Sequence, residues 1–296
     1  MSGAPRRLRV LARGLGFTEG PVWTVDGRLL LVSVNRGRIY EAFLDSSDPR
    51  QIAETGGGPN GLACDADGDV WICQNGGLAM RTKSRIRRGP SIQVLRPGTG
   101  EVVTAAAGPF SSPSDCAMGP DGRLWFTDPR NHHLDDRAEP GRVWALDIRT
   151  MRAEPVLDGI LFPNGLAFGD GGAVLYVAES ATGRVLRFSE SSAGWTRDPW
   201  VAHLPRGVPD GLAVDVDGHV WVVGSFSGDV VRFTGDGRPA ETIELGSGFM
   251  PTSLCYAGAE LDQMVITSAR GGCVVSWQAT IRGMPLFTES ATERTA

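Results

Sequence analysis

Residues 208–223 have the sequence Val-Pro-Asp-Gly-Leu-Ala-Val-Asp-Val-Asp-Gly-His-Val-Trp-Val-Val. Two apolar runs flank the pair Asp217-Gly218, a dipeptide typical of the tight turn of a β-hairpin. We therefore expect one strand before this turn and a second strand, containing Trp221, after it. A further acid, Asp210, precedes the first strand, where a hairpin alone has no need of one.

The pattern of this stretch occurs six times in the chain. The copies open at Glu19, Asn60, Ser114, Asn164, Asp210 and Thr252, at steps of 41, 54, 50, 46 and 42 residues. Steps of roughly 40 to 50 residues are typical of the four-stranded blades of a β-propeller. We predict an all-β fold, a single six-bladed β-propeller domain over residues 1–296 with four antiparallel strands per blade. A β-sandwich is the alternative, and the six aligned copies weigh against it.

The N-terminal segment 8–12 has the pattern of a fourth strand, yet no copy of the repeat precedes it. We expect it to pair with the last blade, near residues 273–279, and so to close the ring. Closure removes the unpaired backbone groups that an open last blade would expose.

Composition limits the partners and the compartment. The 296 residues carry a formal net charge of −5, which gives no support to nucleic-acid binding. No apolar run approaches the ~20 residues of a membrane span, and no apolar segment follows the basic N-terminus as in a secretory signal. We expect a cytoplasmic protein that binds a small-molecule substrate and neither nucleic acid nor membrane. The oligomeric state is not predicted.

The cysteines favour a reducing compartment. They lie in apolar strand-like segments without C-x-x-C spacing, at Cys64, Cys73, Cys116, Cys255 and Cys273. We interpret them as buried free thiols. A disulfide between Cys64 and Cys73, across one hairpin, is the alternative.

The residues that open the six copies define the candidate site, which we call the oxygen ring. The first strand of each blade lines the central tunnel of a propeller, so these residues should meet at one mouth of the tunnel. They are two carboxylates, two amides and two hydroxyls: Glu19, Asn60, Ser114, Asn164, Asp210 and Thr252. Two carboxylates that lie close together repel each other and are costly to bury, and a divalent cation relieves both effects. Oxygen ligands favour Ca²⁺, with Zn²⁺, Mn²⁺ and Mg²⁺ as alternatives.

Simple turn chemistry is the competing explanation for Asn-Gly and Asp-Gly pairs at the opening of a copy. That explanation does not account for Glu19 at the same column of the repeat. We therefore keep the metal hypothesis for the set as a whole.

Two long connections should rim the same mouth, because they join second strands to third strands. The first, residues 74–90, carries the cations Arg81, Lys83, Arg85, Arg87 and Arg88. They favour either an anionic substrate or a solvated basic surface. The second, residues 128–141, contains Arg130 and His132, which we take as substrate-binding candidates, with an exposed polar loop as the alternative. Whether these loops form a lid stays open.

With these motifs identified, the chain resembles the senescence marker protein (regucalcin)/gluconolactonase/luciferin-regenerating-enzyme family. The resemblance rests on four segments and spans nearly the whole chain: FTEGPVW at 17–23, PNGLA at 163–167, PDGLA at 209–213, and residues 112–129. It implies a six-bladed propeller with one catalytic divalent metal ion in the central tunnel.

By the same resemblance, the metal ligands are Glu19, Asn164 and Asp210. Family members typically have Asn-Asp where this chain has Ser114-Asp115. Sugar-lactonase relatives also tend to have arginine where this chain has Ser112.

The leading hypothesis is a divalent-metal-dependent hydrolase of a lactone, similar to a gluconolactonase. The metal would polarise the carbonyl and activate a water, with Asp210 as the catalytic general base. The residues expected to contact substrate are Asn60, Ser114, Asp115, Arg130 and His132. One alternative is a phosphoester or organophosphate hydrolase that uses the same metal site. Another is a non-catalytic propeller that binds metal or ligand.

Overall fold

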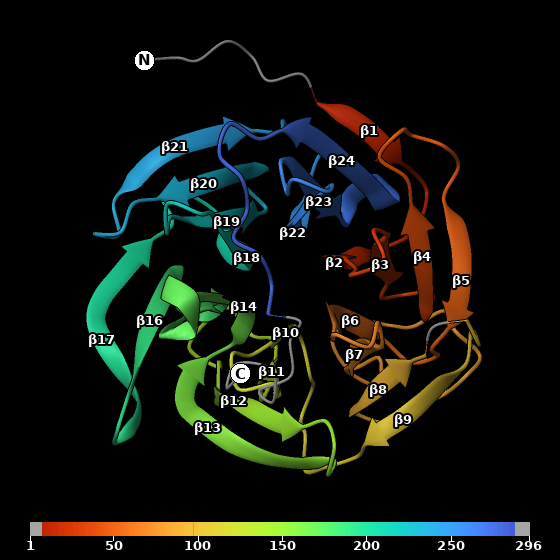
Figure 1. Cartoon of the computed structure of the whole chain (residues 1–296), viewed down its shortest axis with the longest axis horizontal. Coiled ribbons are helices and arrows are strands. Elements are labelled where there is room, and N and C mark those ends of the chain that lie inside the picture. The colour runs from red at the N-terminus through yellow and green to blue at the C-terminus, as the bar shows by residue number, and fades with distance from the viewer. Residues whose placement is uncertain (1–7, 97, 288–296) are drawn as a thin grey trace, which may run out of the picture.

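A computed structural model of the chain describes residues 8–96 and 98–287. Its strands form six four-stranded sheets around a central axis, which confirms the predicted six-bladed β-propeller (Figure 1). No helix in these two ranges is long and apolar enough to cross a bilayer.

Five of the sheets follow the chain in order, each with its first strand innermost. The first blade contains β2 (Thr18–Trp23), β3 (Leu29–Ser33), β4 (Arg38–Ala42) and β5 (Arg50–Glu54). The second contains β6 (Pro59–Cys64), β7 (Val70–Gln74), β8 (Ser91–Leu95) and β9 (Val102–Ala106). The third contains β10 (Cys116–Met118), β11 (Leu124–Asp128), β12 (Pro140–Asp147) and β13 (Arg152–Leu161). The fourth contains β14 (Pro163–Gly169), β15 (Val174–Glu179), β16 (Arg184–Ser191) and β17 (Gly194–His203). The fifth contains β18 (Val208–Val214), β19 (Val220–Ser225), β20 (Asp229–Phe233) and β21 (Pro239–Glu244).

The sixth blade joins the two ends of the chain. Its inner strands are β22 (Pro251–Ala257), β23 (Gln263–Ser268) and β24 (Cys273–Gln278), and its fourth strand is β1 (Arg9–Ala12). β1 pairs antiparallel with β24, with Arg9 opposite Ser276, so the predicted closure is confirmed. Among the described residues, the helical elements are three single 3₁₀ turns: η1 (Asp170–Gly172), η2 (Ser180–Thr182) and η3 (Arg270–Gly272).

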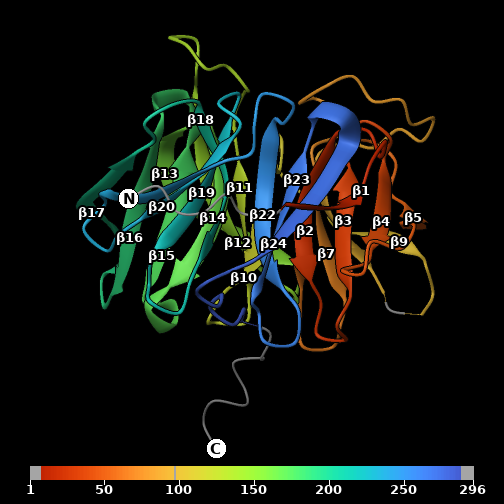
Figure 2. The same ribbon diagram turned by 90° about the horizontal axis from the view of Figure 1, so that it is seen from above.

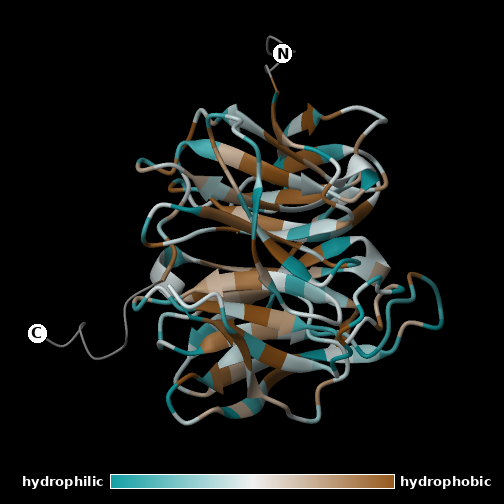
Figure 3. Ribbon diagram, turned by 90° about the vertical axis from the view of Figure 1, so that its right-hand side faces the viewer, coloured by the Kyte–Doolittle hydropathy of each residue, from teal (hydrophilic) through white to brown (hydrophobic). Residues whose placement is uncertain are grey.

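Apolar side chains fill the space between neighbouring blades. Six buried clusters each combine residues of two adjacent sheets, such as Trp125 and Phe168 between the third and fourth blades. The connecting loops are largely hydrophilic, and the strands carry most of the hydrophobic residues (Figure 3). Second strands such as β3 and β19 are buried along their whole length, whereas burial alternates along an outer strand such as β17. This alternation is the period of a strand that presents one face to a neighbouring sheet.

All five cysteines are buried and free, as predicted. The disulfide alternative is wrong because Cys64 lies opposite Val70 in the β6–β7 register, whereas Cys73 lies opposite Ile92 of the next strand. The two thiols therefore do not face each other across the hairpin.

The two mouths of the tunnel differ. The long loops that follow β7 and β11 extend from one face of the disc, and residues 279–287 lie on the opposite face (Figure 2). That segment crosses the opposite mouth and is fixed there by backbone hydrogen bonds, from Gly283 N–H to Leu261 O at 2.8 Å and from Met284 N–H to Val214 O at 2.9 Å. It closes a mostly apolar cavity of about 100 Å³ inside the tunnel, lined by residues that include Leu62 and Leu166. The repeat pattern does not predict this closure.

Candidate active site

At the oxygen ring, the backbones of neighbouring inner strands come close together, without side chains between them. A Cβ on Gly20 would lie 2.2 Å from the backbone oxygen of Asn60, and one on Gly165 would lie 2.3 Å from that of Asp210. Because real Cβ atoms do not come so close, a glycine is required after the ring residue in these blades. The same close approach gathers the ring residues of adjacent blades around the axis.

The ring residues lie where the inner strands begin, on the face that carries the two long loops. Glu19 and Ser114 are buried, at 7% and 2% exposure, and Asn164 and Asp210 are half-buried. The Ser114 hydroxyl donates to Asn164 Oδ1 at 3.2 Å, across the boundary between the third and fourth blades. Asn60, at the start of β6, is likewise half-buried.

Thr252, at the start of β22, is fully buried and has a different environment. Its hydroxyl donates to the backbone oxygen of Thr18 at 2.8 Å and lies 2.8 Å from the Thr267 hydroxyl. It therefore joins the sixth blade to the first.

Three carboxyl groups perturb one another at the ring. Burial raises the pKa of Glu19 well above its ordinary value, and the charges of Asp210 and Asp115 raise it further. Burial raises the pKa of Asp210 to about 7, with a smaller contribution from Asp115, while a hydrogen bond from Ser225 acts in the opposite direction. These carboxyl groups thus repel one another in a site of low solvent access.

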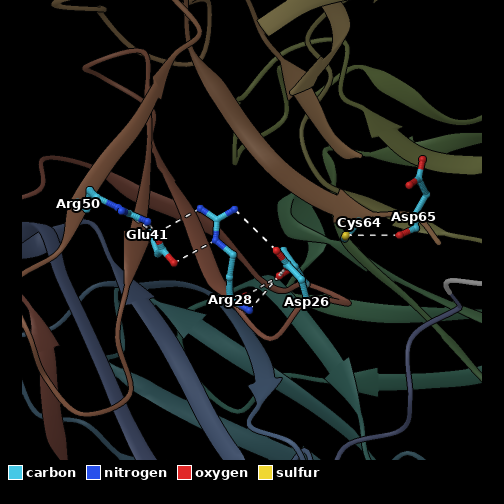
Figure 4. Close-up of polar contacts among 7 residues, drawn as sticks. Asp26, Arg28, Glu41, Arg50, Cys64 and Asp65 are labelled. Carbon is cyan, nitrogen blue, oxygen red and sulfur yellow. Dashed lines mark hydrogen bonds and ion pairs between the residues drawn. The ribbon is translucent and has the colours of Figure 1, made fainter. Parts of the chain in front are cut away.

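Four buried acids elsewhere in the described residues, Glu41, Glu179, Asp215 and Asp229, have a cationic partner, whereas two others, Asp65 and Asp128, accept hydrogen bonds from N–H groups only. Glu41 accepts from Arg28 Nε at 3.0 Å and also pairs with Arg50 (Figure 4). Glu179 pairs with Arg184 in the same way. Among the described residues, no ion pair involves Glu19, Asp115 or Asp210, so no cationic side chain offsets the charge of these carboxylates when they ionise.

Two serines that the sequence reasoning missed hold the ring residues in place. Ser180 accepts a hydrogen bond from Asn164 Nδ2 at 3.2 Å and donates to the backbone oxygen of Pro209 at 2.6 Å. Ser225 donates to Asp210 Oδ2 at 2.9 Å. Both serines lie at the end of a second strand: Ser180 directly follows β15, and Ser225 is the last residue of β19. This shared position is the signal that could have revealed them.

Asp115 lies on the inner side of the ring. Its carboxylate accepts from the backbone N–H of Cys116 at 2.9 Å and of Leu166 at 3.3 Å, and it also lines the apolar cavity. A Cβ on Gly61 would lie 2.6 Å from Asp115 Oδ1, so the glycine of the second blade leaves room for this carboxylate. Burial raises the pKa of Asp115 to about 7 against these two hydrogen bonds.

The loop after β11 brings both His132 and Arg130 next to residues 111–113, which lead into the ring. His132 Nε2 lies 3.4 Å from the hydroxyl of Ser112, two residues before Ser114. Burial lowers the pKa of His132 to about 4, so its imidazole is neutral at physiological pH. Arg130 is exposed at the rim, and its contacts are with the Ser111 hydroxyl, at 3.4 Å, and with Glu139.

The basic loop after β7 is anchored on the first blade. Lys83 N–H donates to Asn35 O at 2.6 Å, and Gly57 N–H donates to Ile86 O at 2.9 Å. The side chains of its five cations are exposed and form no ion pair with any described residue: Arg81, Lys83, Arg85, Arg87 and Arg88. The loop therefore places unneutralised positive charge on the face that carries the ring.

A second acidic group, at the opposite mouth, already has a cation. Asp215, Asp217 and His219 lie within 4.8 Å of one another in the β18–β19 turn. Arg232 Nε donates to Asp215 Oδ2 at 2.9 Å, and its Nη2 lies 2.8 Å from His219 Nδ1. Asp215 also accepts from Trp221 Nε1 at 3.0 Å, which makes it a structural cap of the turn.

Residues 17–270 match the family described as the SMP-30/Gluconolactonase/LRE-like region. The chain belongs to this family. A pentonolactonase of Haloferax volcanii is 28% identical over 272 residues, which cover 89% of this chain and 85% of that protein. A gluconolactonase of Zymomonas mobilis is 26% identical over 299 residues, covering 88% and 79%. Both relatives are named for hydrolysis of a lactone, in agreement with the predicted enzyme class.

Solved structures of this family share the fold. Regucalcin of Agrobacterium tumefaciens, described as a calcium-binding protein, superposes with a TM-score of 0.79 at 18% identity and covers 96% of this chain and 98% of its own. A gluconolactonase of Xanthomonas campestris gives a TM-score of 0.75 at 23% identity, with coverage of 92% and 89%. At these identities the likeness concerns the propeller alone.

Proposed function

We propose that the protein is a divalent-metal-dependent hydrolase of a lactone, with Ca²⁺ as the leading metal. The observation that carries the proposal is the unneutralised charge of the oxygen ring, where Glu19, Asp115 and Asp210 meet without a described cationic partner. The lactone class comes from the relatives named as a pentonolactonase and a gluconolactonase.

The donor set at the ring fits a hard cation. Glu19 and Asp210 each offer a carboxylate, and Asn164 offers an amide oxygen, so we assign these three as the metal ligands. A divalent charge would remove the repulsion that raises the pKa of Glu19 and Asp210. Thiols and imidazoles, which favour softer metals, form no part of this set.

When bound, such a cation supplies Lewis-acid polarisation of a carbonyl and lowers the pKa of a water. The chain's own residues then supply position and proton transfer. The Ser225 hydroxyl fixes the orientation of the Asp210 carboxylate, which would take the proton of the attacking water as general base. Asn60 and Ser114, at neighbouring ring positions, would orient the water and the lactone, while Arg130 and His132 contact substituents at the rim.

Asp115 has a different part in this proposal. Its two oxygens already accept backbone hydrogen bonds, so it complements the positive charge from the inner side of the ring and contacts substrate least.

The test is hydrolysis of a lactone panel by protein that has been stripped with a chelator and then reloaded with Ca²⁺, Mn²⁺, Mg²⁺ or Zn²⁺. We expect turnover to require the metal. Glu19→Gln and Asp210→Asn should each lower kcat/KM by about 100-fold or more while the thermal midpoint stays close to that of the wild type. Asp217→Asn, at the opposite mouth, is the matched control and should retain full activity. Turnover that survives the chelator would reject the mechanism.

The same panel includes a phosphotriester, because a polarising cation acts on a phosphoryl oxygen as well as on a carbonyl. Hydrolysis of the phosphotriester without any lactone would reassign the substrate class. Tight Ca²⁺ binding without turnover of any ester would assign the protein to metal or ligand binding.

A further inference from the structure

At the mouth of the tunnel that carries the oxygen ring, two aromatic residues have a left-handed backbone conformation. Phe162 has a φ of 53° and Phe226 a φ of 70°. Glycine adopts this conformation without strain, whereas a bulky side chain does so at a cost. The four other non-glycine residues with positive φ in the described chain lie in turns at the opposite mouth: Ser46, Met151, Asp170 and Leu261.

Phe226 is both strained and exposed. It occupies the turn between β19 and β20 directly after Ser225, and 65% of its surface is exposed. The turn is closed without the phenyl ring, by the Gly228 N–H donating to Gly224 O at 3.1 Å and by the Ser227 hydroxyl donating to Asp229 Oδ1 at 2.6 Å. Neither packing nor hydrogen bonding of the fold thus accounts for a phenylalanine here.

Phe162 adjoins Ser180, as Phe226 adjoins Ser225. Its backbone oxygen accepts from Ser180 N–H at 3.0 Å, and its ring lies edge-on to His132, with 5.0 Å between ring centroids. It also precedes Pro163, and the residue before a proline normally adopts an extended conformation. Each strained phenylalanine therefore adjoins a serine that holds a ring residue, Asn164 in one case and Asp210 in the other.

Further exposed apolar side chains lie in the two long loops of the same face. Leu78, in the loop after β7, is 64% exposed, and Leu134, in the loop after β11, is 41% exposed. Backbone strain at a functional site persists when the side chain has a task there that the fold does not require. An exposed apolar rim around a polar site is the arrangement that binds a ligand with a polar reacting group and an apolar body.

We propose that Phe162 and Phe226 form an apolar wall of the substrate site and select a lactone that carries an alkyl or aryl substituent. This inference rests on the proposed lactone hydrolysis. The ester group of the substrate faces the oxygen ring, and its substituent lies against the two phenyl rings. A fully hydroxylated sugar lactone would place its hydroxyl groups against the phenyl rings of Phe162 and Phe226, which offer them no hydrogen-bond partner.

The test compares two lactones with the same six-membered ring, δ-valerolactone and its pentyl-substituted analogue δ-decalactone. The measured quantity is the ratio of their kcat/KM values with the metal-loaded enzyme. We expect the wild type to favour δ-decalactone by about tenfold or more, and Phe226→Gly to lower this ratio by about tenfold. Phe226→Gly should also raise or preserve the thermal midpoint, because glycine relieves the strain at this φ.

Met151→Gly is the matched control, since Met151 has a φ of 58° and is 40% exposed at the opposite mouth. It should retain the wild-type ratio and show the same relief of strain. Phe226→Ala provides a second variant with the phenyl ring removed.

The possible results distinguish failure of the apolar-wall proposal from failure of the proposed lactone hydrolysis. Hydrolysis of glucono-δ-lactone without preference for δ-decalactone would overturn the apolar wall and leave the proposed function standing. So would an equal loss on both test lactones in Phe226→Gly and Phe226→Ala. Absence of turnover on every lactone, by wild type loaded with each metal, would overturn the proposed function and the wall together.

Discussion

The Ser225 hydroxyl shares its single proton between two acceptors, Asp210 Oδ2 at 2.9 Å and the backbone oxygen of Pro251. One side chain thereby fixes the orientation of a ring carboxylate and ties the fifth blade to the sixth. Since Pro251 precedes Thr252, the two bonds also set the spacing between adjacent ring positions.

Replacing Ser225 by alanine should therefore weaken metal binding as well as the fold. Loss of an outer partner of a ligating carboxylate typically costs 10- to 100-fold in affinity or activity, and we expect about tenfold in Ca²⁺ affinity. Unfolding in urea should show a loss of about 1–3 kcal/mol, because Asp210 loses a donor in a poorly solvated site.

Ser189→Ala is the control for this variant, since the Ser189 hydroxyl donates to Asp198 Oδ2 at the same distance, 2.9 Å, on β16. It should lose stability and keep the Ca²⁺ affinity of the wild type. Equal Ca²⁺ affinity in both variants would show that Ser225 is structural alone.

Gly61 should tolerate no side chain. A Cβ there would lie 2.6 Å from both Cα and Oδ1 of Asp115. We expect Gly61→Ala to lower the free energy of unfolding by about 1–3 kcal/mol through overpacking, and to lower metal affinity by displacing Asp115. Gly235→Ala is the comparison, because a Cβ at Gly235 meets no atom within 4 Å, and its stability should stay within about 0.5 kcal/mol of the wild type.

Much of the fold and of the ring could be predicted because the information is local and repeated. Alternating apolar residues and Asp-Gly turns specify a hairpin within a few residues, and six copies at blade spacing leave few architectures. The ring followed from a single column of the repeat, since the inner strand of every blade begins at the same mouth. Ring closure followed from the unpartnered fourth strand at residues 8–12.

The remaining features depend on contacts between blades, which the repeat does not encode. Asp115 faces the ring because Gly61 of the previous blade leaves space for its carboxylate, a relation between residues 54 positions apart. The backbone strain at Phe226 cannot be inferred from a sequence that contains an ordinary phenylalanine. The C-terminal segment around Met284 has no strand-like alternation, so its place across the tunnel emerges only when the propeller is formed.

Because β1 closes the circle of blades, the stability of the whole propeller should depend on Leu11. It lies in β1, is 3% exposed, and belongs to the apolar cluster between the sixth and first blades, together with Leu31 and Val274. We expect Leu11→Ala to cost about 2–5 kcal/mol in urea unfolding, the range for a buried leucine. Val25→Ala, at a position 48% exposed, should change stability by less than about 0.5 kcal/mol. A loss below about 1 kcal/mol in Leu11→Ala would mean that β1 contributes little to the closed ring.

The stability of the metal-free protein should fall as the pH rises toward neutrality. The folded-state pKa of Asp115 and of Asp210 is about 7, and that of Glu19 is also raised, so the folded protein binds more protons here than the unfolded chain does. The free energy of unfolding contributed by these groups is therefore fully present below the unfolded pKa of about 4 and is lost up to about pH 7. Thermal melts in chelator between pH 4.5 and 7.5 measure this loss.

Other acids give stability the opposite pH dependence. Hydrogen bonds from Arg28 and Arg50 lower the pKa of Glu41, so the stability that Glu41 contributes is lost as the pH falls. The informative quantity is thus the difference in pH slope between the wild type and the Glu19→Gln/Asp210→Asn double variant. The wild type should have the more negative slope in chelator, because the double variant no longer carries these two titrating groups. Ca²⁺ at 100 times its Kd should restore about 2.7 kcal/mol at pH 7.5 in the wild type and little in the double variant. Identical slopes for the two proteins would contradict an unneutralised acidic ring, and with it the reason for placing a cation there.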